Sequence, residues 1–173
     1  MWKFISVIVV SAGIIGALVW GIWFAPPHDG AVSDLARLGA LRFADYEGSF
    51  VSLADFSGKA LVVNSWAVWC PFCKKELEDF ARLQETFGER VAVVAVDRAE
   101  PLAKSKEFTD SISVTGRMTF LIDPSDSFYK AIGGFSMPET LFIDRDGRIA
   151  FHKRGPLTFE DMQRQVEALL GIR

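Results

Sequence analysis

The chain contains two cysteines, Cys70 and Cys73, separated by two residues. Two thiols at this spacing can hold a metal, form a structural disulfide or open and close a disulfide reversibly. A closed zinc site needs four ligands, and only His28 and His152, which lie at unrelated spacings, could join the cysteines. A structural disulfide across so short a loop removes little entropy from the unfolded chain. The pair therefore favours reversible thiol–disulfide exchange.

The elements around the cysteines indicate which thiol should react. Residues 60–66 (ALVVNSW) predict a buried strand, and residues 71–87 predict an amphipathic helix. Cys70 would lie at the helix N-terminus, where free N–H groups and the helix dipole stabilise a thiolate. We therefore expect Cys70 to be the exposed attacking nucleophile, followed by Pro71 in the first turn. Cys73, one turn further in, would resolve the mixed disulfide.

Glu76 follows the cysteines on the apolar face of the predicted helix. At about 100° per residue it falls inside the arc that holds Cys73, Leu77 and Phe80. Burial in such an arc raises the pKa of a carboxyl group, so Glu76 is a candidate proton carrier near neutral pH. The alternative is a glutamate whose side chain reaches water at the edge of the apolar stripe.

Short apolar segments alternate with helical ones along the rest of the chain. Strands are predicted at residues 48–53, 60–66, 90–96, 118–122, 140–143 and 148–152, and helical segments at residues 33–41, 71–87, 101–109, 128–132 and 158–170. Asp97 and Arg98 would end one of the strands near the cysteines, but nothing assigns them chemistry. The pattern predicts an α/β fold with a mixed central sheet flanked by helices.

The N-terminus carries an apolar segment, residues 4–24, without any charge. At about 1.5 Å per residue, a helix of this length spans the hydrocarbon core of a bilayer. The bulky residues Trp23 and Phe24 at its end suit a membrane interface better than a signal-peptide cleavage site. A buried core helix is the alternative. Since Lys3 precedes the segment and Asp29 follows it, we expect the N-terminus inside the cell and the domain outside.

The predicted organisation is a membrane anchor at residues 1–24, a linker and short helix at residues 25–44, and one domain at residues 45–173. The formal net charge is −3, the pI is about 5.4, and no basic stripe is present. We therefore expect no nucleic-acid partner.

Two separated motifs resemble a known family. Residues 61–73 (LVVNSWAVWCPFC) resemble the active-site signature of thioredoxin-like proteins, in particular the membrane-anchored thiol-disulfide oxidoreductases of the TlpA/ResA and CcmG (DsbE) group. Residues 137–144 (MPETLFID) resemble the cis-proline segment of this group, and the Pro-Glu-Thr sequence is typical of its cytochrome c maturation members. The resemblance covers residues 48–170 and implies a thioredoxin-like fold.

The resemblance also implies roles for individual residues. Pro138 would be cis and lie beside Cys70, and the peptide of Met137 would offer an extended edge to a substrate backbone. Glu76 would handle protons, because Asn64 occupies the position where ordinary thioredoxins keep a buried acid. The implied substrate-binding residues are Trp69, Pro71, Phe72, Met137 and Pro138.

The implied activity is the reduction of disulfides in extracytoplasmic proteins, among them apocytochrome c before haem attachment. The expected location is the bacterial inner membrane, with the domain facing the periplasm or cell exterior. A membrane thiol donor of the CcdA/DsbD type would supply electrons, and no organic cofactor or metal is implied.

Three other activities remain open at this stage. Pro71-Phe72 differs from typical versions of the motif, and the intervening pair helps to set the redox potential, so a disulfide-donating oxidase is the nearest alternative. A peroxidase of related fold is less well supported, because its reactive cysteine would lie outside such a pair. A non-enzymatic chaperone or adaptor that uses the same groove belongs to a different class.

Overall fold

The computed structural model describes residues 34–172. The strands are β1 (Arg42–Asp45), β2 (Phe50–Ser52), β3 (Ala60–Trp66), β4 (Val91–Arg98), β5 (Thr119–Asp123), β6 (Glu139–Ile143) and β7 (Ile149–Arg154). The helices are α2 (Asp34–Leu38), α3 (Cys73–Phe87), α4 (Leu102–Ser111), α5 (Ser127–Ala131) and α6 (Phe159–Leu170), with short 3-10 turns at η1 (Leu53–Phe56) and η2 (Gly88–Arg90).

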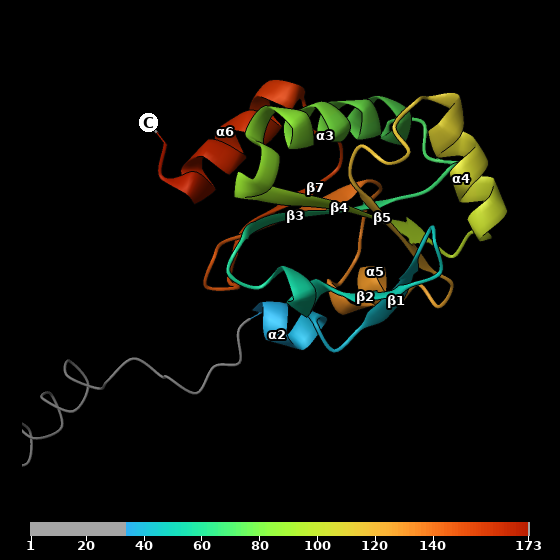
Figure 1. Cartoon of the computed structure of the whole chain (residues 1–173), viewed down its shortest axis with the longest axis horizontal. Helices are drawn as coiled ribbons and strands as arrows, with labels where there is room; N and C mark the ends of the chain where they lie inside the picture. Colours follow the sequence, from blue (N-terminus) through green and yellow to red (C-terminus); the bar gives the residue numbers. More distant parts are fainter. Residues whose placement is uncertain (1–33, 173) are drawn as a thin grey trace, which may run out of the picture. The chain divides into compact units, whose positions relative to one another are not determined.

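All these strands form one sheet in the order β2-β1-β5-β4-β3-β6-β7. The central strands β3, β4 and β5 are parallel, whereas β1, β2, β6 and β7 pair antiparallel at the two sides. Figure 1 shows α3 and α6 covering one face of the sheet and α2 and α5 covering the other. The α/β fold with a mixed, helix-flanked sheet is therefore confirmed.

The alternation of side chains along β3 divides the core into two layers. All seven residues of β3 are buried, as expected for a central parallel strand. Val62 points to the cluster under α3 and α6, which also contains Phe80, whereas Leu61 and Val63 point to the cluster that contains Phe128 of α5. The strand that leads to the cysteines is thus fixed on both faces.

Most predicted ends of helices and strands differ from the structure by one to three residues, and two further differences concern a whole strand and the start of the central helix. β1 begins at Arg42, within the segment expected to be linker and short helix, and pairs with both β2 and β5. Only Phe43 of this strand is buried, so its apolar signal is weak. Helix α3 begins at Cys73 rather than Pro71, because its first four-residue hydrogen bond runs from Glu76 N to Phe72 O at 3.3 Å.

Among the described helices, none is both long and apolar enough to cross a membrane. The predicted span at residues 4–24 lies outside the described residues, as does His28 in the predicted linker.

Candidate active site

The two cysteines form a disulfide where β3 gives way to α3. Their Cα atoms are 5.4 Å apart, and the bridge lies beyond the carboxyl end of a buried parallel strand. Ligand and reaction sites of open α/β sheets commonly lie at this edge. Both cysteines belong to the same core cluster as Trp66 at the end of β3. The reactive pair is therefore held by the core rather than carried on a free loop.

Cys70 is buried in this disulfide form, which corrects the expectation of an exposed nucleophile. The residue is 3% exposed, and its N–H donates to Ala67 O at 3.1 Å, which turns the loop back onto the core. It also lies before the N-cap residue of α3, Phe72, rather than in the first turn of the helix. In the oxidised protein Cys70 is therefore covered by its surroundings rather than open to solvent.

Glu76 is buried on the inner face of α3, with an exposed fraction of 2%. Its Oε1 accepts a hydrogen bond from Leu157 N at 2.7 Å, and its Oε2 accepts one from Asn64 Nδ2 at 3.2 Å. Burial raises the pKa of Glu76 to about 7, although both hydrogen bonds favour the charged form. The alternative of a side chain that reaches water is wrong, and the carboxyl group can gain or lose a proton near neutral pH.

Asn64 connects Glu76 to the centre of the sheet. It lies on β3 opposite Thr140 of β6 in the antiparallel register, and its Nδ2 also lies 3.1 Å from Thr140 Oγ1. Its side chain is fully buried, and its Oδ1 has no hydrogen-bond partner within residues 34–172. The Asn64 side chain thus donates to Glu76 from the strand position where, by the resemblance, ordinary thioredoxins have a buried acid.

The segment before β6 contains the cis peptide that the resemblance implied. The Met137–Pro138 bond is cis, Pro138 is buried, and Met137 packs against the core cluster that contains both cysteines. The two motifs, far apart in sequence, are therefore brought to the same part of the molecule.

Glu139, which was not among the predicted site residues, organises this cis-proline loop. Glu139 is fully buried, and its Oε1 accepts hydrogen bonds from Phe135 N at 2.6 Å and Ser136 N at 2.7 Å. Its Oε2 lies 2.7 Å from His152 Nε2 on β7. Tyr129 OH donates to Ser136 O at 3.0 Å from the other side of the loop. A carboxylate at the start of an apolar strand was the signal that could have revealed this role.

Exposed aromatic side chains lie on both loops. Trp69 is 60% exposed and Phe72 is 55% exposed in the cysteine loop, whereas Phe135 is 82% exposed in the cis-proline loop. Pro71 is exposed as well. Trp69, Pro71 and Phe72 were predicted to contact substrate, and Phe135 was not. Trp69, Pro71 and Phe72 thus offer apolar surface in the loop that carries a buried disulfide, and Phe135 offers apolar surface in the cis-proline loop.

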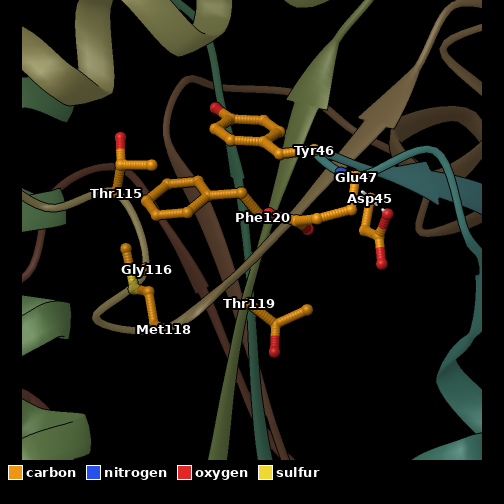
Figure 2. A pocket seen from close by; sticks show the side chains of 8 residues that line it. All are labelled: Asp45, Tyr46, Glu47, Thr115, Gly116, Met118, Thr119 and Phe120. Atoms are coloured by element: carbon orange, nitrogen blue, oxygen red, sulfur yellow. Dashed lines mark hydrogen bonds between the residues drawn. The ribbon is translucent and has the colours of Figure 1, made fainter.

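A separate pocket of about 230 Å³ lies beside the aromatic side chains of Tyr46 and Phe120. Its lining residues are Asp45, Tyr46, Glu47, Thr115, Gly116, Met118, Thr119 and Phe120 (Figure 2). Tyr46 stacks on Phe120 with ring centroids 5.2 Å apart, and Phe120 meets Trp66 edge to face. The pocket contains none of the predicted site residues, so the candidate site is the surface around the disulfide.

Comparison with known proteins adds independent information. The Redoxin family matches residues 32–170. The thiol-disulfide oxidoreductase ResA of Geobacillus kaustophilus (strain HTA426) is 26% identical over 165 residues, which cover 95% of this chain and 92% of that protein. The thioredoxin-like protein YneN of Bacillus subtilis (strain 168) is 30% identical over 125 residues, which cover 69% of this chain and 71% of YneN.

Solved structures show the same fold. The structure of MTB dsbF in mixed oxidised and reduced forms superimposes with a TM-score of 0.72 at 24% identity, covering 80% of this chain and 99% of dsbF. A thiol:disulfide interchange protein of the thioredoxin family from Chlorobium tepidum superimposes with a TM-score of 0.66 at 25% identity, covering 76% of this chain and 93% of that protein.

Proposed function

Since the chain belongs to the Redoxin family and is a thioredoxin-like thiol-disulfide oxidoreductase of the TlpA/ResA/CcmG type, we propose that it reduces disulfides of proteins outside the cytoplasm. The observation that carries the exchange chemistry of this proposal is the burial of Glu76 beside the side-chain amide of Asn64, one helical turn after Cys73. A carboxyl group that titrates near neutral pH suits a reaction in which thiols must lose and regain protons.

The proposed cycle begins with the reduced protein. The Cys70 thiolate attacks one sulfur of a substrate disulfide, forms a mixed disulfide and releases the other substrate sulfur as a thiolate, which takes a proton. Glu76 accepts the proton of the Cys73 thiol, and the Cys73 thiolate then attacks the Cys70 sulfur. This step forms the Cys70–Cys73 disulfide and releases the second substrate sulfur as a thiolate, which takes the proton held by Glu76. Two electrons pass from the protein to its substrate.

The proposed substrate is apocytochrome c before haem attachment, as the Pro-Glu-Thr sequence at residues 138–140 suggests. The proposed electron source is a membrane thiol protein of the CcdA/DsbD type, because an oxidising compartment has no reduced glutathione pool to reopen the disulfide. We place the domain on the outer side of the bacterial inner membrane, held there by residues 4–24. The cycle needs no organic cofactor or metal, since the two sulfurs carry the electrons.

The decisive experiment is to trap the mixed disulfide. A Cys73→Ser variant expressed in a cytochrome-producing bacterium should accumulate partners linked through Cys70, and non-reducing electrophoresis with mass spectrometry should identify them. Cys70→Ser is the matched control, because it retains one thiol but lacks the attacking sulfur. Apocytochrome c among the linked partners would support the specific substrate, whereas a broad mixture would indicate a general reductase.

A measured redox potential separates this proposal from its nearest alternative. Protein pairs of this type span about −270 to −120 mV, and a value near the upper end would identify a disulfide-donating oxidase. If no partner becomes linked through Cys70, the proposed cycle is wrong.

A further inference from the structure

A second buried carboxylate lies behind the cysteine loop and has no part in the cycle above. Glu100 is 7% exposed and follows β4 by two residues. Its Oε2 accepts a hydrogen bond from Val68 N at 2.6 Å, in the loop between β3 and Cys70. A side chain that follows one strand thus holds the backbone of the loop that follows the neighbouring strand.

The loop has few other fixed points among the described hydrogen bonds. Cys70 N donates to Ala67 O at 3.1 Å, and Cys73 N donates to Cys70 O at 3.2 Å, so both bonds lie within the segment itself. The bond from Val68 to Glu100 joins the loop to a different element. Because its acceptor is a carboxylate, it is also of the stronger, charge-assisted kind.

The turn that carries Glu100 has a costly backbone conformation. Ala99 has a φ of 57°, in the left-handed region that residues with a Cβ rarely adopt. Its N–H donates to Asp123 O at 3.1 Å, which holds the turn against β5. Strained backbone that persists in a well-packed protein often marks a position with a functional reason. Here the strain places Glu100 beneath the cysteine loop.

Asp97 and Lys104 complete the support of Glu100. Glu100 N donates to Asp97 Oδ1 at 3.0 Å, and Lys104 Nζ lies 2.5 Å from Glu100 Oε1. Asp97 is fully buried, is the register partner of Trp66 and has no hydrogen-bond partner for its Oδ2 within residues 34–172. Burial raises the pKa of Asp97, and the neighbouring charge of Glu100 raises it further. Asp97 thus fixes the backbone of Glu100, whereas Lys104 contacts the carboxylate oxygen that does not bind Val68.

Buried carboxyl groups cost stability unless they are hydrogen-bonded or paired. Leucine-like side chains would fill the end of a buried strand without that cost. Among the hydrogen bonds of residues 34–172, the bond from Val68 N joins these groups to the cysteine loop, so holding the loop is what the carboxylate adds.

We propose that Glu100, supported by Asp97, is a positioning residue that fixes the loop at Val68 and so keeps Cys70 close to the start of α3 for attack. Without this hydrogen bond the loop moves away from the core, and the Cys70 thiol loses the stabilisation that nearby N–H groups give its thiolate. The inference rests on the proposed function only in assigning the attack to Cys70.

Alkylation of Cys70 in the reduced full-length chain tests this proposal. In a Cys73→Ser background only one thiol reacts, and its rate with iodoacetamide between pH 5 and 9 reports the thiolate fraction. For Glu100→Ala we expect the midpoint of the profile to rise by about one pH unit and the rate at pH values below the parent midpoint to fall about tenfold, because one unit of pKa is a factor of ten in the thiolate fraction there. Glu100→Asp, which keeps the charge but has a shorter reach, should behave alike.

Two variants separate positioning from a general loss of structure. Glu100→Gln keeps an oxygen within reach of Val68 N and should restore the rate to within about twofold of the parent. Lys104→Met removes the ion pair but leaves the Val68 bond and should also stay within about twofold. If Glu100→Ala does not fold, the comparison of Glu100→Asp with Glu100→Gln decides. The proposal is overturned if the Asp variant keeps the parental profile, or if Gln is as impaired as Asp.

This measurement needs no protein substrate, so it is independent of the trapping experiment. Captured partners with an unchanged Cys70 profile in the Glu100 variants would overturn the inference alone. A shifted Cys70 profile without any captured partner would overturn the proposed function alone.

Discussion

Asn64 on β3 donates a hydrogen bond to Glu76 on α3, with 3.2 Å between Nδ2 and Oε2. A neutral amide therefore stabilises a buried carboxylate without adding a positive charge to the site. Leu157 N provides the second donor, at 2.7 Å from Oε1. Since desolvation outweighs both bonds, the pKa of Glu76 rises to about 7. The carboxyl group is thus able to change its protonation state at the pH where the cycle operates.

The first prediction concerns the pH dependence of stability in the oxidised protein. The pKa of Glu76 is raised from 4.5 to about 7, so the folded state binds more protons than the unfolded state between these values. The free energy of unfolding should fall by about 3 kcal/mol as the pH rises from about 4.5 to about 7, and Glu76→Gln should lack this decrease. Urea titrations at several pH values measure the difference.

Asp97 is a second buried carboxyl group that contributes to the pH dependence of stability in both proteins. Burial raises its pKa as well, and because Glu76→Gln leaves the surroundings of Asp97 unchanged, its contribution is equal in both proteins and cancels in their difference. Identical slopes for wild type and Glu76→Gln would show that Glu76 does not titrate in this range.

Glu76→Gln should also slow the reaction cycle. At pH 7 the attack of Cys73 on the mixed disulfide should be about a hundredfold slower than in wild type, because the variant has no carboxylate to accept the Cys73 proton.

The second prediction concerns the cis-proline loop. Glu139→Ala leaves the N–H groups of Phe135 and Ser136 without their carboxylate acceptor. It should therefore lower the free energy of unfolding by about 2 kcal/mol or more. His152→Ala removes one partner of the same carboxylate at a partly exposed position and should cost about 1 kcal/mol or less. Chemical denaturation gives both values. Equal losses in the two variants would contradict the role given to Glu139.

Glu139→Ala should also affect protein disulfides and small-molecule disulfides differently. Because Glu139 fixes the loop and not the sulfurs, Glu139→Ala should raise KM for a protein disulfide while the rate with a small aromatic disulfide stays within about threefold of wild type. A parallel loss with both substrates would instead place Glu139 in the sulfur chemistry.

The third prediction uses two exposed phenylalanines as a matched pair. Phe135 is 82% exposed in the cis-proline loop, and Phe50 is 75% exposed on β2, the strand at the far edge of the sheet. Phe135→Ser and Phe50→Ser should each change the free energy of unfolding by no more than about 0.5 kcal/mol, because both side chains lie at the surface. Phe135→Ser should weaken reduction of a protein disulfide about fivefold, as expected for loss of an exposed aromatic contact.

Phe50→Ser should reduce the same protein disulfide at the wild-type rate, as measured by the kinetics of thiol release. If both variants slow the reaction to the same extent, the effect does not come from contact near the disulfide.

Much of the fold could be predicted because its signals are local. The run ALVVNSW indicated β3 with the bounds that the structure has, since seven apolar or small residues between turns suit a buried strand. The three- and four-residue spacing of Leu77, Phe80, Leu83 and Phe87 indicated α3, because it places these side chains on one face of a helix. β1 was missed because one buried residue, Phe43, cannot reveal a strand that depends on its neighbours.

The helix boundary and the burial of Cys70 could not be predicted from the motif. Pro71 suits the first turn of a helix, but here a tight turn precedes it and the helix starts at Cys73. Whether a residue before a helix is exposed depends on which elements pack over it. Cys70 is buried because the loop folds back onto the core cluster that contains Trp66.

The amino-acid sequence by itself determined the chemistry of this protein: two thiols at the end of a buried strand, and a carboxyl group on the inner face of the helix that follows. These features depend on spacings of a few residues, which helix and strand periodicity convert directly into direction. Only the tertiary structure decided the partners. Leu157 is 81 residues from Glu76, and Glu100 is 32 residues from Val68. Contacts across such separations arise from the order of the strands in the sheet and the packing of the helices on its faces.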